Sequence, residues 1–301
     1  MNPIISVLIP VHNRQEMITR CLESVLGQTI DDIEIIVVDD GSTDATRTAV
    51  RGIQDRRIKI IELPTNCGVS IARNVGLACA QAPYVAMIDS DDYSEPKRFE
   101  YQLVHLENNQ EVAAVGTQCI KHLSKKKIYQ KHPIEDNTIK ANLFFSNGSA
   151  MINSSTMVRR KFIQNNNLNF PSVYRGEDHE FWLSMMLAGA KFSNLENHLH
   201  HYRRHESNLT SNKLLFKYNL RRKHLFQKKF LLESFFALTS REAAAISLTA
   251  LSQELPSLAI IKEAKQGLEK IHSERVNKYS IDIASLLTPI ENLITKATLR
   301  S

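Results

Sequence analysis

Short apolar runs alternate with segments of helical spacing along roughly the first hundred residues of the chain. The apolar runs are Ile4–Val11, Ile33–Val38, Ile58–Leu63 and Tyr84–Ile88. Each has the length of a buried β-strand, and the segments between them repeat apolar residues every three or four positions, as Met17, Cys21 and Val25 do. This alternation predicts an α/β fold in which helices cover a mainly parallel sheet.

The pattern changes in the rest of the chain. Glu95-Pro96 is typical of a first helical turn, so we expect a helix over 95–107, followed by a strand over Val112–Thr117. Helical spacing returns over 179–188. From about residue 206 glycine becomes rare and strand-like runs disappear. We therefore predict an α/β domain over residues 1–208 and a helical C-terminal region over residues 209–301.

The net charge of the chain, +6, belongs to its C-terminal region. Residues 206–301 carry 15 Lys and Arg against 9 Asp and Glu, so the part before them is balanced. This balance gives no reason to expect a nucleic-acid partner. In the C-terminal region Lys213, Lys217 and Arg221 lie on one helical stripe with apolar neighbours. Such a stripe fits docking on an anionic membrane surface, and it equally fits packing within the protein or against a second copy.

The sequence gives no signal for export or membrane insertion. No apolar run approaches the roughly 18–20 residues that span a bilayer, and the first strand begins too early for a signal peptide. The cysteines, Cys21, Cys67, Cys79 and Cys119, lack metal-binding spacing and are typical of reduced thiols. We expect a cytoplasmic protein.

Carboxylates cluster where two predicted strands end. Asp89-Ser90-Asp91-Asp92 follows the fourth apolar run, and Asp39-Asp40 follows the second. Ligands bind at the carboxyl edge of such sheets, and closely spaced carboxylates suit Mg²⁺ or Mn²⁺ bound together with substrate phosphates. The alternative for the first motif is an acidic turn that caps the next helix. Asp40 could accept hydrogen bonds from a nucleobase imide or a ribose.

The first strand ends at Pro10 and is followed by His12, Asn13 and Arg14. His12 could serve as a general base, as a stacking partner for a nucleobase, or only as a turn residue. Its place at the predicted sheet edge favours stacking.

Four motifs occur together in the order and spacing of a known family. They are Ile5–Arg14, Val37–Asp44, Gly68–Gly76 and Asp89–Asp92. In combination they resemble the family 2 glycosyltransferases, inverting enzymes of the GT-A fold. The resemblance is close over roughly residues 3–100 and continues loosely to about residue 210. It implies a GT-A catalytic domain that binds a nucleotide-diphosphate sugar.

The resemblance also implies a donor site with a divalent metal ion, Mg²⁺ or Mn²⁺. The residues expected to bind the nucleotide sugar are Pro10, His12, Asn13, Asp40, Arg73, Asn74, Asp89, Ser90 and Arg203. Asp40 would bind the uracil of a UDP-sugar, although most relatives have Tyr where this chain has His12. Asp91 would hold the metal, Asp89 would face the ribose or the metal, and His205 would complete the metal shell.

The catalytic residues implied by the resemblance are Asp178 and, as a fallback, Glu177, at the start of the predicted helix. Asp178 would deprotonate a hydroxyl of a glycan or lipid-linked acceptor, and the positive end of the helix would favour its ionised form. A lipid-linked acceptor would place the protein at the inner face of the cytoplasmic membrane. Two alternatives remain: an acidic first helical turn without catalytic function, and a catalytically silent sugar-nucleotide-binding module on the same fold.

Overall fold

The computed structural model describes residues 2–123, 126–145, 150–172, 176–205, 239–251 and 258–273. The chain divides into two compact units. One comprises Met1–Ile134 and Met151–Asn208, and the other comprises Glu135–Ala150 and Leu209–Ser301. The predicted α/β domain over residues 1–208 differs from this division in one segment, because Glu135–Ala150 groups with the C-terminal region. The predicted basic stripe from Lys213 to Arg221 lies outside the described residues.

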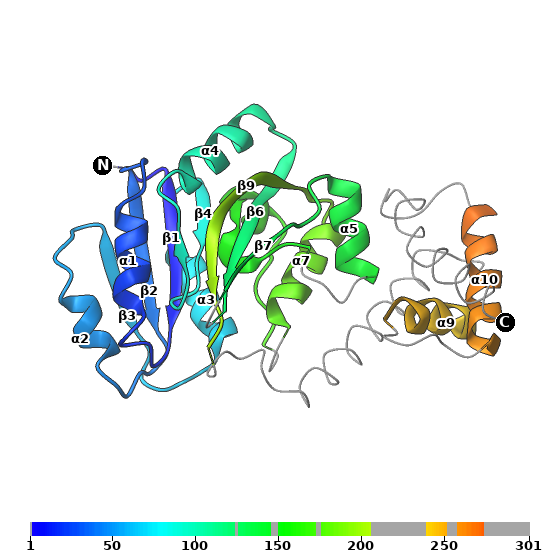
Figure 1. Ribbon diagram of the computed structural model, residues 1–301, viewed down its shortest axis with the longest axis horizontal. Coiled ribbons are helices and arrows are strands. Elements are labelled where there is room, and N and C mark those ends of the chain that lie inside the picture. Colours follow the sequence, from blue (N-terminus) through cyan, green and yellow to red (C-terminus); the bar gives the residue numbers. More distant parts are fainter. Residues whose placement is uncertain are drawn as a thin grey trace. The chain divides into compact units, whose positions relative to one another are not determined.

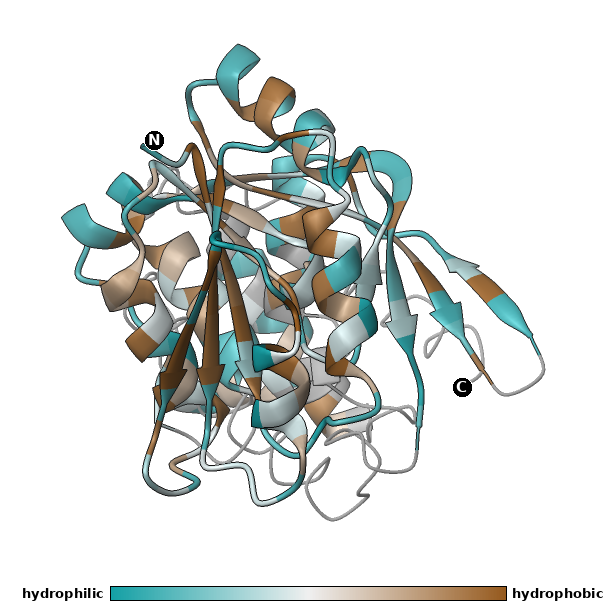
Figure 2. Ribbon diagram, turned by 90° about the vertical axis from the view of Figure 1, so that its left-hand side faces the viewer, coloured by the Kyte–Doolittle hydropathy of each residue, from teal (hydrophilic) through white to brown (hydrophobic). Residues whose placement is uncertain are grey.

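Strands and helices alternate through the first part of the chain, as the apolar pattern predicts (Figure 1). The elements are β1 (Ile5–Val11), α1 (Ile18–Leu26), β2 (Ile33–Asp39), α2 (Thr46–Arg51), β3 (Ile58–Glu62), α3 (Val69–Cys79) and β4 (Tyr84–Met87). Every residue of β1, β2 and β4 is buried. This burial explains why these strands are mostly apolar rather than alternating (Figure 2).

The elements that follow are less regular. In the first unit they are β5 (Tyr93–Ser94), α4 (Arg98–Asn108), β6 (Val112–His122), β7 (Lys127–Gln130), the 3-10 helix η1 (Asn153–Ser155), β8 (Met157–Arg159), α6 (Arg160–Asn165), α7 (Glu177–Leu187) and β9 (Lys191–Arg203). In the second unit they are α5 (Asp136–Phe145), α9 (Ser240–Leu251) and α10 (Leu258–Ser273). None of the described helices has both the length and the apolar character of a membrane span.

The described strands form one sheet in the order β3-β2-β1-β4-β8-β6-β9-β5, with β7 paired to β6. Strands β3, β2, β1 and β4 are parallel, whereas β8 runs antiparallel to both of its neighbours. Strands β6 and β9 are again parallel, and β5 pairs antiparallel with the end of β9. The last pairing matters for the site, because it brings the end of β9 beside the segment that follows β4.

Helices cover both faces of the parallel strands. On one face Ile5, Val7 and Ile9 pack with buried residues of α1 and α4, and on the other Leu8 packs with α3. This division follows from the alternation of side chains along a strand. Helix α3 approaches β1 so closely that a Cβ on Gly76 would lie 1.8 Å from Leu8 Cδ1.

Two helix starts differ from prediction. Helix α4 begins at Arg98, because Glu95 still donates its backbone N–H to the carbonyl of Leu199 and so extends the pairing of β5 with β9. Helix α7 begins at Glu177, two residues earlier than predicted. Strand β7 pairs antiparallel with the end of β6.

Candidate active site

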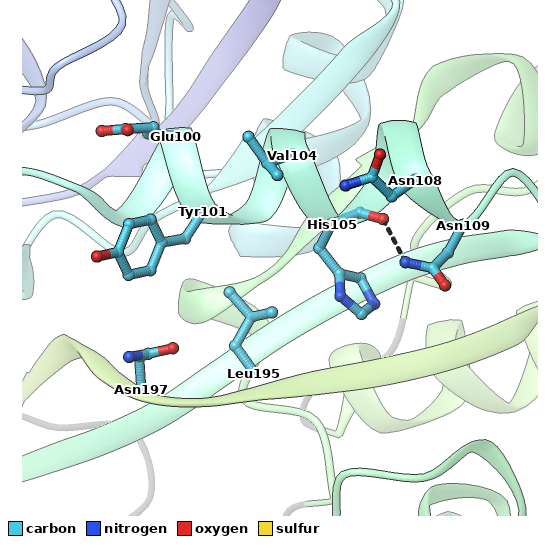
Figure 3. A pocket seen from close by; sticks show the side chains of 8 residues that line it. All are labelled: Glu100, Tyr101, Val104, His105, Asn108, Asn109, Leu195 and Asn197. Atoms are coloured by element: carbon cyan, nitrogen blue, oxygen red, sulfur yellow. Dashed lines mark hydrogen bonds between the residues drawn. The ribbon is translucent and has the colours of Figure 1, made fainter.

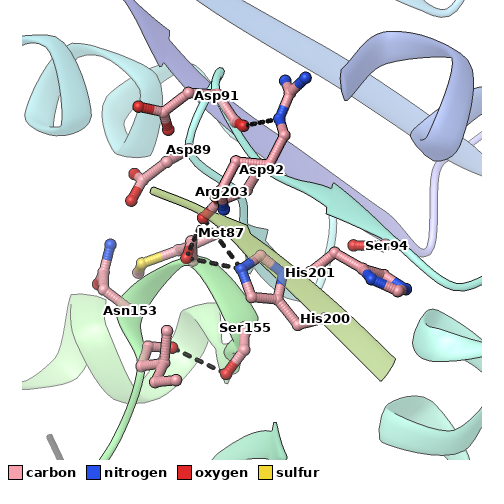
Figure 4. Close-up of polar contacts among 12 residues, drawn as sticks. Met87, Asp89, Asp91, Asp92, Ser94, Asn153, Ser155, His200, His201 and Arg203 are labelled. Atoms are coloured by element: carbon pink, nitrogen blue, oxygen red, sulfur yellow. Dashed lines mark hydrogen bonds and ion pairs between the residues drawn. The ribbon is translucent and has the colours of Figure 1, made fainter. Parts of the chain in front are cut away.

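The acidic turn Asp89–Asp92 joins β4 to β5 at the carboxyl edge of the parallel strands. The Asp92 N–H donates to the Asp89 carbonyl at 2.9 Å, which closes the turn. The Asp92 carboxyl group faces the interior: Oδ1 accepts from the Arg203 N–H at 3.0 Å, and Oδ2 lies 3.0 Å from His200 Nε2 (Figure 4). Burial, reinforced by the charge of Asp89, raises the pKa of Asp92 to about 8. Asp92 therefore anchors the turn to β9.

Asp91 points to the opposite side of this turn, where basic side chains gather. Its Oδ2 lies 2.9 Å from His205 Nε2 and 3.6 Å from Arg14 Nε. Arg203 donates from its guanidinium to the Asp91 carbonyl and to the Met17 carbonyl, so β9 and α1 both hold the turn. The structure thus brings together Asp91 and His205, two of the three residues predicted to bind a metal, whereas the third, Asp89, bonds to Arg73.

Asp40 lies at the end of β2 and is buried. Its two carboxylate oxygens accept backbone hydrogen bonds from Cys67 (2.7 Å) and Gly68 (2.9 Å) at the start of α3. The close approach of this segment requires Gly41, which has a φ of +67° and whose Cβ would lie 2.4 Å from the carbonyl carbon of Thr65. Asp40 therefore lies in the predicted nucleobase site and also holds in place the loop that surrounds this site.

His12 lies beside Asp40 at the end of β1. Its Nδ1 is 2.8 Å from the Asp40 carbonyl oxygen and its Nε2 is 3.3 Å from Asn13 Nδ2. These contacts are satisfied by a neutral ring that donates through Nδ1 and accepts through Nε2. A neutral ring at this edge is compatible with the predicted stacking on a base.

The amides of Asn13 and Asn74 are engaged by the backbone of the protein. Asn13 Oδ1 accepts from the Thr43 N–H at 2.8 Å. Asn74 makes two bonds to Phe170: its Nδ2 donates to the carbonyl at 2.7 Å, and its Oδ1 accepts from the N–H at 2.8 Å. Both residues hold loops beside the predicted nucleotide site, and their predicted role in nucleotide binding stays a prediction.

Pro10 and Ser90 are both buried at the sheet edge. Pro10 of β1 pairs with Val38 of β2. The pairing of β1 with β4 ends at Leu8, so the missing N–H of Pro10 removes no hydrogen bond between strands. Ser90 lies within the acidic turn. The structure places both residues at the predicted site, and no described contact gives either a more specific role.

Arg73 connects the sheet edge to α7. Arg73 is 5% exposed, and its guanidinium donates to Asp89 Oδ1 at 2.9 Å and to Glu177 Oε1 at 2.7 Å. These carboxylates hold the pKa of Arg73 above its ordinary value despite the burial of its guanidinium. The two acidic motifs that the sequence predicts therefore meet at one guanidinium.

Asp178 follows Glu177 in the first turn of α7 and accepts from the His179 N–H at 2.7 Å. Burial raises the pKa of Asp178 to about 6, with a further upward contribution from the charge of Glu177. Arg73 acts in the opposite direction. The result is a carboxylate that is largely ionised at neutral pH and is a stronger base than an ordinary Asp, which suits a general base.

Sequence reasoning missed three contributors to this arrangement. Cys67 and Gly68 act through backbone N–H groups, which have no residue-specific signature. Ser154 contacts Asp92 at 2.9 Å but comes from η1, in a stretch without apolar periodicity. The contribution of Ser154 becomes visible only in the folded structure, where η1 lies against β4.

This fold and site define a class of protein. A sheet covered by helices, with carboxylates at its carboxyl edge and a second acidic pair on a helix facing them, is the arrangement of a nucleotide-diphospho-sugar transferase of GT-A type. Residues 6–166 match the family described as glycosyl transferase family 2. The chain therefore belongs to this family, and it is a glycosyltransferase.

Known proteins and solved structures show the same relationship. An uncharacterized glycosyltransferase from Haemophilus influenzae is 31% identical over 223 residues, which cover 69% of this chain and 68% of that protein. The enzyme named UDP-Glc:alpha-D-GlcNAc-diphosphoundecaprenol beta-1,3-glucosyltransferase WfaP from Escherichia coli is 29% identical over 220 residues, 70% of this chain and 81% of that protein. The structure of S. aureus TarS in complex with UDP-GlcNAc superimposes with a TM-score of 0.65 at 20% identity, covering 89% of this chain and 81% of that chain. This last likeness concerns the fold.

Proposed function

We propose that this glycosyltransferase moves a sugar from a UDP-sugar to a hydroxyl group of a glycan or lipid-linked acceptor, with inversion at the anomeric carbon. The observation that carries the proposal is the bridge made by Arg73. It joins Asp89, at the edge where a nucleotide diphosphate would bind, to Glu177, which adjoins the candidate base Asp178. Donor site and base are thus held in one charged network.

The UDP part of the donor fits the edge formed by β1 and β2. Asp40 supplies a carboxylate there and His12 a neutral ring, while Arg14 and Arg203 both contact Asp91. Guanidinium groups of this kind suit the oxygens of a diphosphate. The UDP-GlcNAc complex of TarS and the UDP-Glc in the name of WfaP support a uracil base.

The Asp91 and His205 side chains fit a divalent cation of the Mg²⁺ or Mn²⁺ kind. They supply one oxygen and one nitrogen donor at 2.9 Å from each other, whereas Arg73 engages Oδ1 of Asp89. Among the described residues no three His, Cys, Asp or Glu side chains are grouped to hold a metal. Two protein ligands are sufficient for an ion that takes its remaining ligands from diphosphate and water. When bound, such an ion would neutralise the charge of the departing diphosphate.

Asp178 would accept the proton of the acceptor hydroxyl as its oxygen attacks the anomeric carbon. The bond to the diphosphate breaks on the opposite face, so one displacement inverts the configuration and needs no protein nucleophile. The printed name of the E. coli relative supports a lipid-linked acceptor. With such an acceptor the protein would work at the inner face of the cytoplasmic membrane, which co-sedimentation with anionic vesicles would test.

A panel of UDP-sugars with Mn²⁺, assayed for release of UDP with and without polyprenyl-diphosphate acceptors, tests the proposal. The expected result is release by the wild-type protein and loss of at least about a hundredfold in Asp178→Asn. Full activity of Asp178→Asn would refute the assignment of the base. If the wild-type protein bound UDP-sugars and released no UDP under any condition, it would be a silent binding module.

A further inference from the structure

A polar cluster behind the acidic turn holds η1 in place. Ser154 Oγ lies 2.9 Å from Asp92 Oδ2 and 2.9 Å from His200 Nε2, and all three side chains are buried. In the same 3-10 helix Ser155 Oγ donates to the preceding Ile152 carbonyl at 2.9 Å. The position of η1 relative to the acidic turn is therefore fixed by side chains as well as by the backbone.

Asn153, the first residue of η1, is buried without a hydrogen bond for its carboxamide. It is 4% exposed, and neither its Oδ1 nor its Nδ2 has a hydrogen-bond partner in the described parts of the chain. A buried polar group without a partner is costly and uncommon in native proteins. The carboxamide of Asn153 therefore forms no hydrogen bond of the fold and is available to a ligand at the site that it adjoins.

Asn153 lies next to the proposed donor site. The Thr156 carbonyl accepts from the Met87 N–H at 2.9 Å, so the chain that follows η1 runs beside the end of β4, two residues before Asp89. Figure 4 shows the Asn153 carboxamide extending toward the Asp89 carboxylate. No direct hydrogen bond joins the two side chains.

We propose that Asn153 recognises the sugar of the donor and shares one sugar hydroxyl with Asp89. A hydroxyl group both donates and accepts, so it can accept from Asn153 Nδ2 and donate to Asp89, while Oδ1 can accept from a second hydroxyl. The carboxylates of Asp89, Glu177 and Asp178 outnumber the guanidinium of Arg73. They would repel an anionic sugar, so the substrate class is a neutral hexose or N-acetylhexosamine. This inference rests on the proposed function.

Calorimetric binding of UDP, UDP-Glc, UDP-Gal and UDP-GlcNAc to the full chain tests this role. For Asn153→Ala we expect about tenfold weaker binding of the preferred UDP-sugar, as for the loss of one or two neutral hydrogen bonds, and unchanged binding of UDP. The melting temperature should not fall, because no hydrogen bond of the fold is removed. Ser155→Ala is the matched control: it removes a hydroxyl of the same 3-10 helix that bonds within the protein, and it should leave the preference for UDP-sugar over UDP unchanged.

The possible outcomes separate this inference from the proposed function. A parallel loss of UDP and UDP-sugar affinity in Asn153→Ala, or no loss of either, would overturn the sugar contact while leaving the UDP-sugar donor intact. A fall in melting temperature without a change in selectivity would assign Asn153 to the fold and overturn the inference as well. A wild-type protein that binds neither UDP nor any of these UDP-sugars would overturn both. Asn153→Ser, which keeps a smaller hydroxyl donor and acceptor, should recover part of the selectivity.

Discussion

The ionisation of Asp178 should control the pH dependence of the enzyme, and Glu177→Gln is the variant that tests this control. Burial and the charge of Glu177 raise the pKa of Asp178 to about 6 from an ordinary value of 3.8. A base must be deprotonated to act, so activity should rise with pH through about 6. Glu177→Gln removes the raising charge and leaves the charge of Arg73, which lowers the pKa of Asp178, balanced by one carboxylate fewer. Both effects move the acid limb to lower pH.

The size of the effect follows from the titration curve. With a pKa of about 6, roughly 9% of Asp178 is ionised at pH 5 and roughly 91% at pH 7, so the rate should differ about tenfold between these pH values. If the pKa of Asp178 fell all the way to 3.8 in Glu177→Gln, the two rates would be nearly equal. For Glu177→Gln, the ratio of the rate at pH 7 to the rate at pH 5 should therefore lie between about one and ten.

Initial rates of sugar transfer, measured from pH 4.5 to 8.5 with saturating metal, provide the assay. Asp178→Asn serves as the reference without a base and should lose activity at every pH. An acid limb that stays in place or moves to higher pH in Glu177→Gln would refute the electrostatic reasoning. Complete loss of activity in Glu177→Gln, with activity retained in Asp178→Asn, would instead make Glu177 the base.

Three further predictions concern the metal, a loop and the core. Treatment with EDTA should abolish transfer, Mn²⁺ should restore it, and His205→Ala should need more Mn²⁺ for half-maximal activity; activity unaffected by EDTA would exclude a metal requirement. Asn74→Ala leaves the Phe170 backbone without two partners and should lower the free energy of unfolding by about 1–3 kcal/mol, as chemical denaturation would show. Gly76→Ala forces a methyl group into Leu8 and should cost a similar amount; an unchanged denaturation midpoint would contradict the packing described.

The parallel half of the fold could be predicted because three of its strands, β1, β2 and β4, are buried on both faces. Continuous apolar runs such as Ile33–Val38 stand out from the segments around them, and acids directly after them mark the carboxyl edge. The irregular half carries no such contrast. Strand β7 is rich in polar and exposed residues, so its sequence reads as a basic loop, and only pairing with β6 makes it a strand.

The residue types of the candidate site could be predicted from the sequence, but the contacts between them could not. Asp91 and His205 are far apart in the sequence, and the short pairing of β5 with β9 brings them together. Asn74 lies in a motif typical of the family, yet its amide is occupied by the backbone of Phe170. Residue identity indicates which chemistry is available, whereas pairing between distant segments decides which side chains are left for a ligand.

Arg73 shows how this distinction changes a role. The resemblance to the family assigns Arg73 to the nucleotide, but its buried guanidinium already bonds to Asp89 and Glu177. Without it, the carboxylates of Asp89, Glu177 and Asp178 would lose the guanidinium that balances their charge, and Asp178 would hold its proton more tightly. Asp178 can therefore remain a carboxylate at neutral pH because Arg73 balances its neighbours. If Asp178 is the base, as proposed, the residue that keeps it ionised need not contact the acceptor, the sugar or the nucleotide.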